Sequence, residues 1–158
     1  MKVEVRNSKI QGRGVYATKD IKKGEVIIVW HPKKVINLEE LEKLSEEERD
    51  HTHYIGGGKY FLMGEPERFV NHSCNPNSFI GPGYKDIALK EIRKGEEITS
   101  DYSIGGTGGR RIKCSCGSNN CRKILDEDFF KLPKEIQRKY YPFLEEWFKK
   151  EFNDRLLR

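Results

Sequence analysis

Four cysteines are the residues of this chain whose type and spacing point most directly to chemistry. Three of them, Cys114, Cys116 and Cys121, follow a Cys-x-Cys-x4-Cys pattern, and Cys74 lies apart. The N-terminal residues lack the apolar segment of a secretory signal, so we expect a reducing compartment, the cytoplasm, where disulfides are rare. Four thiolates suit a tetrahedral zinc ion, and four protein ligands make such a site structural. The alternative is four free thiols that cluster by chance.

A second segment combines a histidine with one of these cysteines. Residues 68–77 read RFVNHSCNPN, where Pro76 and three asparagines predict irregular backbone. An Asn-His-Ser string is not by itself a catalytic triad. From composition alone, His72 could equally be a buried histidine bonded to backbone.

Short strands and turns must position these groups. Alternating and β-branched runs predict strands over residues 2–5, 15–17, 26–29, 59–63, 87–89 and 97–99. A helix is predicted over 37–50, with Asn37 as its N-cap. From residue 126 onward the pattern changes to helix, and it carries an apolar stripe that we interpret as a packing face: Phe143, Leu144, Trp147, Phe148 and Phe152.

Four motifs, in order along the chain, resemble those of SET-domain protein-lysine methyltransferases. The segment at 68–77 is similar to the family signature Arg-Phe-x-Asn-His-Ser-Cys-x-Pro-Asn. Residues 12–17 (GRGVYA) resemble its Gly-x-Gly motif, and residues 95–102 (GEEITSDY) resemble Gly-Glu-Glu-Leu-Thr-x-Asp-Tyr. Residues 114–122 (CSCGSNNCR) are similar to the post-SET zinc motif, whose fourth ligand is the cysteine of Asn-His-Ser-Cys.

The resemblance implies a fold and an organisation. The fold would be mainly β with some α, the β-clip or SET fold, with small curled sheets around a pseudoknot, a zinc-bound post-SET loop and C-terminal helices. We expect a SET domain over 1–105 with a variable insert at about 32–60, a post-SET zinc motif over 106–125 and a helical extension over 126–158. The extension could pack on the core, bind substrate or dimerise the chain, and the oligomeric state stays open.

The resemblance also implies an activity and its residues. The reaction would transfer a methyl group from S-adenosylmethionine to a lysine ε-amine of a protein substrate, a histone or another basic protein. Tyr102 would be the catalytic tyrosine, Tyr54 would line the lysine channel, and Leu125 would cover the adenine. The other cofactor-binding residues would be Gly12, Arg13, Gly14, Asn71 and His72, and the zinc ligands would be Cys74, Cys114, Cys116 and Cys121.

One position departs from the family pattern. Ser100 stands two residues before Tyr102, where the family usually has Phe or Tyr. A serine leaves a wider pocket, which would permit di- or trimethylation. Alternatively, its hydroxyl could hold water and limit the product.

Composition excludes some functions and leaves two alternatives. The longest apolar run, Val26–Trp30, is too short to span a membrane. The 30 basic and 25 acidic residues make a mixed surface with a net charge of +5, which permits nucleic-acid contact without arguing for it. One alternative is a catalytically inactive SET module that binds a peptide or partner. The other is a zinc-dependent nucleic-acid binder that uses the basic residues Arg110, Arg111, Lys113, Arg122 and Lys123, but it leaves residues 12–17 and 94–102 unexplained.

Overall fold

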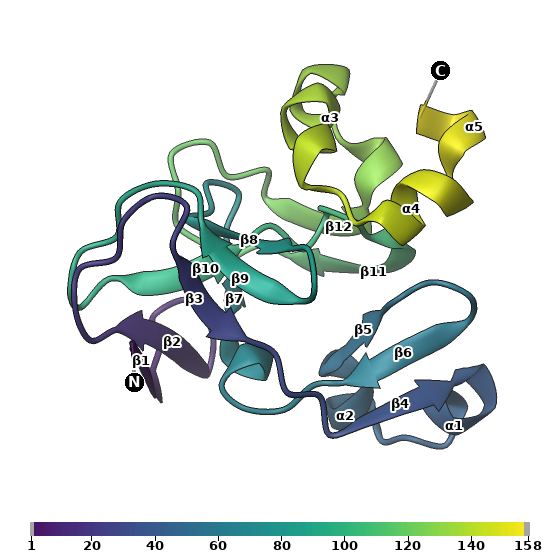
Figure 1. The fold of residues 1–158 in the computed structure, drawn as a ribbon, viewed down its shortest axis with the longest axis horizontal. Coiled ribbons are helices and arrows are strands. Elements are labelled where there is room, and N and C mark those ends of the chain that lie inside the picture. Colours follow the sequence, from purple (N-terminus) through teal and green to yellow (C-terminus); the bar gives the residue numbers. More distant parts are fainter. Residues whose placement is uncertain (1, 157–158) are drawn as a thin grey trace.

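Over residues 2–156, the strands form four small sheets instead of one large sheet (Figure 1). The computed structural model describes residues 2–156, and for Gly109 only the backbone. The sheets, each in its spatial order, are β1 (Val3–Asn7), β2 (Arg13–Ala17), β10 (Glu97–Ser100) and β7 (Asn71–His72); β3 (Val26–Val29), β9 (Lys85–Ala88) and β8 (Ser78–Gly81); β4 (Lys34–Asn37), β6 (Lys59–Leu62) and β5 (Thr52–Tyr54); and β11 (Thr107–Lys113) with β12 (Ile124–Asp128). The predicted fold class, mainly small β-sheets with a few helices, is confirmed.

Strand β10 brings together segments that are far apart in the sequence. It pairs antiparallel with β2 and parallel with the two-residue strand β7. In this register, Thr99 lies opposite Asn71 and Ser100 opposite His72. Residues 13–17, 71–72 and 97–100 therefore lie side by side, and three of the four sequence motifs meet in one sheet.

The insert between β3 and β7 is a separate small sheet with two short helices. Helices α1 (Leu38–Glu42) and α2 (Glu46–Asp50) connect β4 to β5. The prediction of one helix over 37–50 is therefore wrong. Asn37 forms a capping box with Glu40, and Ser45 forms a second one with Glu48. The second cap starts a new helix because the backbone N–H of Glu48 donates to the Ser45 side chain. In a continuous helix, that N–H would donate to a backbone carbonyl of the preceding turn.

The helical extension begins later than the sequence predicted. Residues 126–128 belong to β12, in which Asp126 pairs with Arg111 and Leu125 with Ile112. Residues 126–128 are extended because they pair with strand β11, and sequence periodicity could not reveal that pairing. The helical elements that follow β12 are η2 (Phe129–Lys131), α3 (Lys134–Tyr140), η3 (Tyr141–Phe143), α4 (Glu146–Glu151) and α5 (Asn153–Leu156). A further 3-10 turn, η1 (Glu67–Phe69), directly precedes β7. None of the helices over residues 2–156 is long and apolar enough to cross a membrane.

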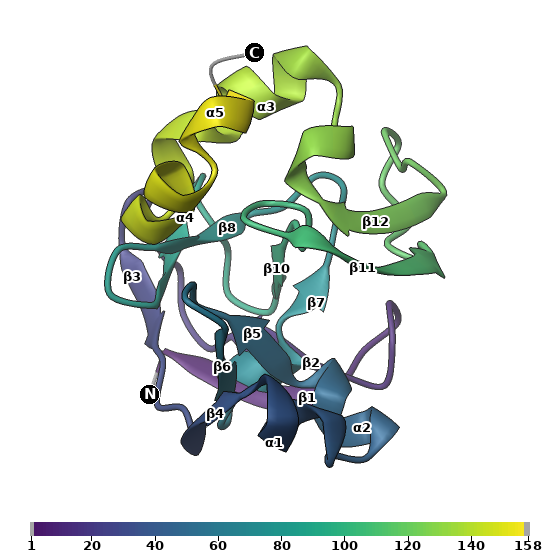
Figure 2. The ribbon, with the colours of Figure 1, turned by 90° about the vertical axis from the view of Figure 1, so that its right-hand side faces the viewer.

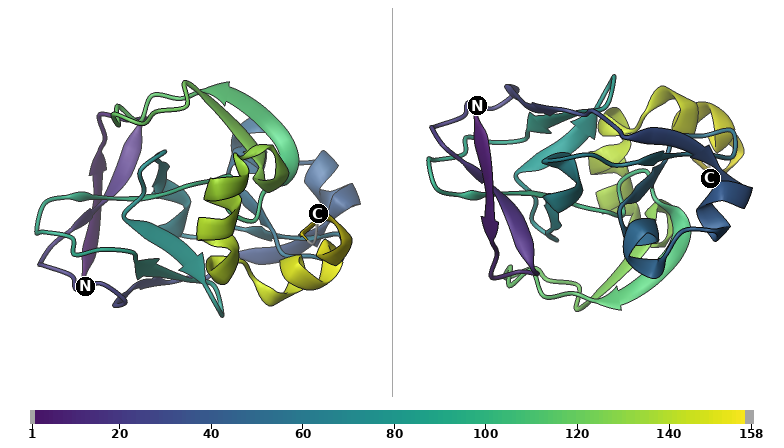
Figure 3. Two further views of the ribbon diagram at one scale, coloured as in Figure 1. Left: turned by 90° about the horizontal axis from the view of Figure 1, so that it is seen from above. Right: turned by 90° about the horizontal axis from the view of Figure 1, so that it is seen from below.

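Two hydrophobic clusters hold these elements. The first lies among the N-terminal sheets and includes Val15, Ile21 and Ile98, all fully buried. The second is built by the extension around Phe129 and Phe148, which are also fully buried. The predicted apolar stripe is thus a packing face. Figure 2 shows the extension and the β11–β12 hairpin on one side and the insert on the other. Figure 3 shows β1 and β2 at the opposite end from α4 and α5.

We expect Phe148→Ala to destabilise the protein by about 3–5 kcal/mol, because it leaves a cavity in the second cluster. Phe148 is 0% exposed and its ring contacts Phe129, Phe130 and Phe152. The control is Tyr141→Ala, at a side chain that is 47% exposed in the same extension, with an expected loss below about 1 kcal/mol. Urea unfolding measures both. Equal losses would contradict the assignment of Phe148 to a core.

Candidate active site and metal centre

Asn71 ties the glycine turn after β1 to strand β10. Its side-chain amide donates to the backbone carbonyls of Gln11 at 3.2 Å and Arg13 at 3.0 Å, and to the Glu97 carboxylate at 2.8 Å. A Cβ at Gly14 would meet that carboxylate, so a larger residue here would displace the Glu97 side chain from its place beside Asn71. The structure therefore brings together the predicted cofactor residues at 12–14 and 71. Asn71 thus shapes this turn through its side-chain amide.

His72 is a buried, neutral imidazole between the turn at Tyr102 and the cysteine cluster. Its Nδ1 accepts the backbone N–H of Tyr102 at 3.3 Å, and its Nε2 lies 3.4 Å from the Cys74 sulfur. Burial lowers the pKa of His72 to about 4, although the Asp101 carboxylate lies 3.7 Å away. With Nδ1 as the acceptor, the ring proton resides on Nε2 and points toward sulfur.

Tyr102 lies two residues after the end of strand β10, with its hydroxyl turned toward the end of η1. That hydroxyl donates to the backbone carbonyl of Val70 at 2.7 Å, and the ring lies 5.4 Å from the His72 ring. Burial raises the pKa of Tyr102, so the phenol is protonated at neutral pH. Ser100 lies two residues earlier and is buried, and its carbonyl accepts the N–H of Ser73 at 2.9 Å.

The surroundings of Tyr54 and Leu125 differ from those expected for a channel residue and an adenine-covering residue. The Tyr54 hydroxyl donates to Glu151 of α4 at 2.9 Å, and its ring lies 5.2 Å from the Trp147 ring. Its described contacts are thus with the extension and the insert, and not with Tyr102. Leu125 is 1% exposed, whereas the neighbouring Ile124 is 41% exposed. Ile124 therefore offers more surface to a ligand than Leu125 does.

The four cysteine sulfurs form one cluster. All four lie within 4.8 Å of one another, and the sulfurs of Cys74 and Cys114 are 3.8 Å apart. A tetrahedral zinc ion with Zn–S bonds of about 2.3 Å places its sulfurs about 3.8 Å apart, so the cluster fits zinc. Backbone N–H groups of Arg122 and Lys123 donate to Cys74 and Cys121 at 3.3 and 3.4 Å. Burial raises the pKa of the Cys74 thiol, so a bound cation would have to displace its proton.

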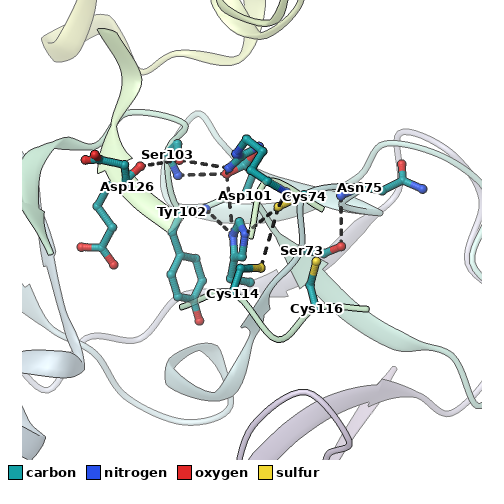
Figure 4. A network of polar contacts seen from close by, with 12 residues as sticks. Ser73, Cys74, Asn75, Asp101, Tyr102, Ser103, Cys114, Cys116 and Asp126 are labelled. Carbon is teal, nitrogen blue, oxygen red and sulfur yellow. Dashed lines mark hydrogen bonds and ion pairs between the residues drawn. The ribbon is translucent and has the colours of Figure 1, made fainter. Parts of the chain in front are cut away.

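A buried ion pair joins the cysteine cluster to the turn at Tyr102, and the sequence analysis missed it. Asp101 is 3% exposed, and its carboxylate accepts two bonds of 2.8 Å from the Arg122 guanidinium. The Tyr140 hydroxyl of α3 lies 3.4 Å from the same carboxylate, and the Ser103 N–H donates to it at 3.1 Å. Figure 4 shows Asp101, Tyr102 and Ser103 next to Cys74 and Cys114.

The same pairing weakens the nucleic-acid alternative. Arg122, assigned by that alternative to a phosphate-binding patch, instead bonds Asp101 in the interior. Arg110 bonds Glu127 of β12 at 2.7 Å and also Asp50 of the insert. Two of the five proposed phosphate contacts are thus engaged by carboxylates of the chain itself. Arg122 directly follows the last cysteine, and this adjacency was the only sequence signal for its role.

Comparison with known proteins identifies a family and several relatives. The model of the SET domain family matches residues 12–103. The chain is 35% identical over 143 residues to the histone-lysine N-methyltransferase trithorax of Drosophila virilis, across 78% of this chain and 4% of that protein. It is 34% identical over 142 residues to human histone-lysine N-methyltransferase 2D, across 78% of this chain and 2% of that protein. The chain thus spans only a small part of the length of these relatives.

Solved structures agree in fold. A crystal structure of a Plasmodium falciparum protein, described as a candidate histone methyltransferase, superposes with a TM-score of 0.52 at 25% identity. It covers 62% of this chain and 90% of that chain. The methyltransferase domain of the human histone-lysine N-methyltransferase SETMAR superposes with a TM-score of 0.61 at 22% identity, covering 80% of this chain and 58% of that chain. The second likeness speaks to the fold alone.

Loss of one cysteine ligand should release the metal. We expect the chain, purified with zinc present, to hold one zinc ion, and Cys74→Ser to lose it along with several kcal/mol of stability. Ser115→Ala, at an exposed position between two ligands, is the control and should keep both. Elemental analysis and thermal unfolding with and without a chelator measure the effect. Zinc retained by Cys74→Ser at full stability would contradict the ligand assignment.

Removing the guanidinium from Arg122 should leave a buried charge without its partner. We expect Arg122→Gln to lose about 3–5 kcal/mol, because the Asp101 carboxylate stays buried and uncompensated. The control is Arg111→Gln, whose side chain is 73% exposed and lies 4.0 Å from Asp126; its expected loss is below about 1 kcal/mol. Urea unfolding of the zinc-loaded proteins measures both. A small loss in Arg122→Gln would show that the ion pair does not hold the hairpin.

Proposed function

The chain belongs to the SET-domain family, and from that membership we propose that it is a protein-lysine N-methyltransferase dependent on S-adenosylmethionine. The observation that carries the proposal is the convergence of three motifs on one sheet. Asn71 holds the turn at 12–14, His72 accepts the backbone N–H of Tyr102, and the half-buried Tyr102 ring lies beside the His72 ring. The intact position of Tyr102 favours this function over an inactive binding module.

We propose that the cofactor binds along the turn at Gly12–Gly14 and against the β7 backbone at Asn71 and His72. The bound cofactor supplies a methyl group activated by a sulfonium. Gly12 has a φ of +48°, and apart from its two chain neighbours no residue lies within 4 Å of where its Cβ would be, so this turn is open on one side. The Arg13 guanidinium stacks on the Phe69 ring at 3.8 Å, which fixes the side chain between the two glycines.

The residues around Tyr102 suit an amine nucleophile. A lysine ε-amine reacts only when neutral, and its ordinary pKa is about 10.4. A buried channel favours the neutral amine, because desolvation penalises the ammonium. The protonated Tyr102 hydroxyl, held by the Val70 carbonyl, would orient that amine. His72 is neutral and bonded to the Tyr102 backbone, so its role is to hold Tyr102 and not to act as a strong base. Alignment and water exclusion then supply most of the rate.

Ser100 would set the number of methyl groups. Its small, buried side chain stands two residues before Tyr102. We propose that it leaves space for a methylated amine, so that the enzyme makes di- or trimethyllysine. A water held by the Ser100 hydroxyl would instead stop the reaction earlier.

The four cysteines would hold a structural zinc ion, because all four coordination positions are filled by protein. As substrate we propose a protein with an accessible lysine, a histone or another basic chromatin protein. The named activity of the relatives supports this class. The cytoplasm remains the proposed compartment, and action on nuclear chromatin is compatible with the same chemistry.

The test uses isotope-labelled S-adenosylmethionine with a panel of basic proteins. We expect label on a lysine of at least one protein and a loss of about 100-fold in Tyr102→Phe, because the amine is no longer oriented. Tyr141→Phe, at an exposed tyrosine, is the control and should stay active. Mass spectrometry of the product counts the methyl groups.

Cofactor binding, measured by calorimetry, separates the possible failures. We expect wild type and Tyr102→Phe to bind S-adenosylmethionine equally well. A wild-type chain that does not bind it would contradict the proposed function. Full activity in Tyr102→Phe would contradict the role of that tyrosine.

A further inference from the structure

Asp86 of β9 is a buried carboxylate that the proposed function has not yet used. Its side chain lies in the interior, where the residue is 1% exposed. One oxygen, Oδ2, accepts the indole N–H of Trp30 at 2.7 Å. The other, Oδ1, is buried and has no hydrogen-bond partner within residues 2–156. Buried carboxylates are costly unless they are fully bonded, so the unpaired oxygen of Asp86 calls for an explanation.

The strand pairing turns Asp86 toward the segment that carries Tyr102. Asp86 lies directly opposite Ile80 of β8 in an antiparallel pair, so the two side chains share one face of the sheet. Ile80 lines a small cavity together with His53 and Ile104, with room for about one water molecule. Ile104 lies two residues after Tyr102, and Figure 1 shows β8 and β9 next to β10. The face that carries Asp86 therefore meets the turn that follows Tyr102.

Tyr102 responds to the charge of Asp86. Burial is the main cause of the raised pKa of Tyr102, and four charged groups also act on it: Arg110, Glu127, Asp86 and Glu97. Arg110 and Glu127 bond each other at 2.7 Å, and Glu97 accepts hydrogen bonds from neighbouring side chains. Of these four groups, Asp86 is the one with a buried oxygen that bonds nothing in the described part of the chain. It is thus the group near Tyr102 that is placed to accept a proton.

The surroundings of Asp86 bring its proton affinity close to neutral pH. Burial raises the pKa of Asp86 to about 7, the Trp30 hydrogen bond opposes this shift, and the negative charge of Glu67 adds to it. Its strand neighbours on β3 and β8 are apolar isoleucines. His53, whose ring lies 5.1 Å from the Trp30 ring, is neutral because burial lowers its pKa to about 4. A group that titrates near neutral pH is in the range where a general base is most effective.

We propose that Asp86 is a further catalytic residue, the base that takes the proton of the target lysine. This inference rests on the proposed methyltransferase function and deepens it, because desolvation disfavours the ammonium without specifying where its proton goes. In this step an N–H bond of the ammonium breaks, its electron pair stays on nitrogen, and an O–H bond forms at Oδ1 of Asp86. The neutral amine then accepts the methyl group, and Asp86 loses the proton to water before the next turnover.

The test is the pH dependence of kcat/KM between about pH 6 and about pH 9, measured with isotope-labelled S-adenosylmethionine and the panel protein that accepts label. A base works only when ionised, so we expect the wild-type value to rise about tenfold per pH unit below about pH 7 and to level off above it. Asp86→Asn removes the base but keeps an oxygen that accepts the Trp30 N–H. We expect it to be about 100-fold slower at about pH 8. Its value should rise over the whole range, because only lysine that is already neutral reacts.

A second variant and a matched control assign the wild-type rise to Asp86. Trp30→Phe removes the N–H that stabilises the carboxylate, so it should move the rise upward by about one pH unit. The control is Glu145→Gln, because burial, with a contribution from Glu146, also raises the pKa of Glu145 to about 7. This variant should leave the rise in place. Calorimetry with S-adenosylmethionine and urea unfolding check that each variant is folded and binds the cofactor.

The outcomes separate this inference from the proposed function. Methyl transfer by the wild-type chain without a rise near pH 7 overturns the inference and leaves the function standing. The same holds if Asp86→Asn keeps the wild-type rate and profile, or if Glu145→Gln loses the rise. Should Asp86→Asn fail to fold, a rise that stays in place in Trp30→Phe overturns the inference. A wild-type chain that transfers no methyl group to any protein overturns both.

Discussion

The buried carboxylate of Asp101 is the constraint on which the rest of this structure depends. A charge in the interior needs an opposite charge and several hydrogen bonds, and the Arg122 guanidinium supplies two bonds of 2.8 Å. Arg122 lies in the loop between β11 and β12, so its guanidinium reaches Asp101 only when this hairpin folds back over the segment between β10 and β11. The Tyr140 hydroxyl of α3 lies 3.4 Å from the same carboxylate. One carboxylate thereby positions the cysteine loop, the turn at Tyr102 and the start of the extension.

The cysteine cluster and the candidate catalytic tyrosine are connected by a continuous set of contacts. Cys74 contacts the His72 ring through its sulfur and also accepts the backbone N–H of Arg122. His72 in turn accepts the backbone N–H of Tyr102, which directly follows Asp101. A ring of contacts therefore runs from Cys74 through His72, Tyr102, Asp101 and Arg122 back to Cys74. A zinc ion at the sulfurs would lock this ring while remaining outside the reaction, which is how a structural metal can govern the geometry of an active site.

The C-terminal extension adds hydrophobic core to a highly charged chain and also packs against the insert. Its aromatic residues build a second hydrophobic cluster around Phe129 and Phe148, which adds to the modest core of the small sheets. It also closes the space beside the insert, where Glu151 and Trp147 hold the Tyr54 hairpin. Tyr54 is therefore held by Glu151 and Trp147, two residues that lie outside the segment matched by the family model.

The sequence by itself determined the family, the β-rich fold class and the candidate metal ligands, because these depend on residue types and spacings that are local in the chain. Cys114, Cys116 and Cys121 identify a metal loop without any knowledge of its surroundings. Only the tertiary structure decided that residues 126–128 are a strand, since their partner β11 lies earlier in the chain. It alone turned Arg122 inward to Asp101 and left one carboxylate oxygen of Glu145 without a hydrogen-bond partner. Burial and charge pairing depend on which distant groups meet, and no local pattern contains that information.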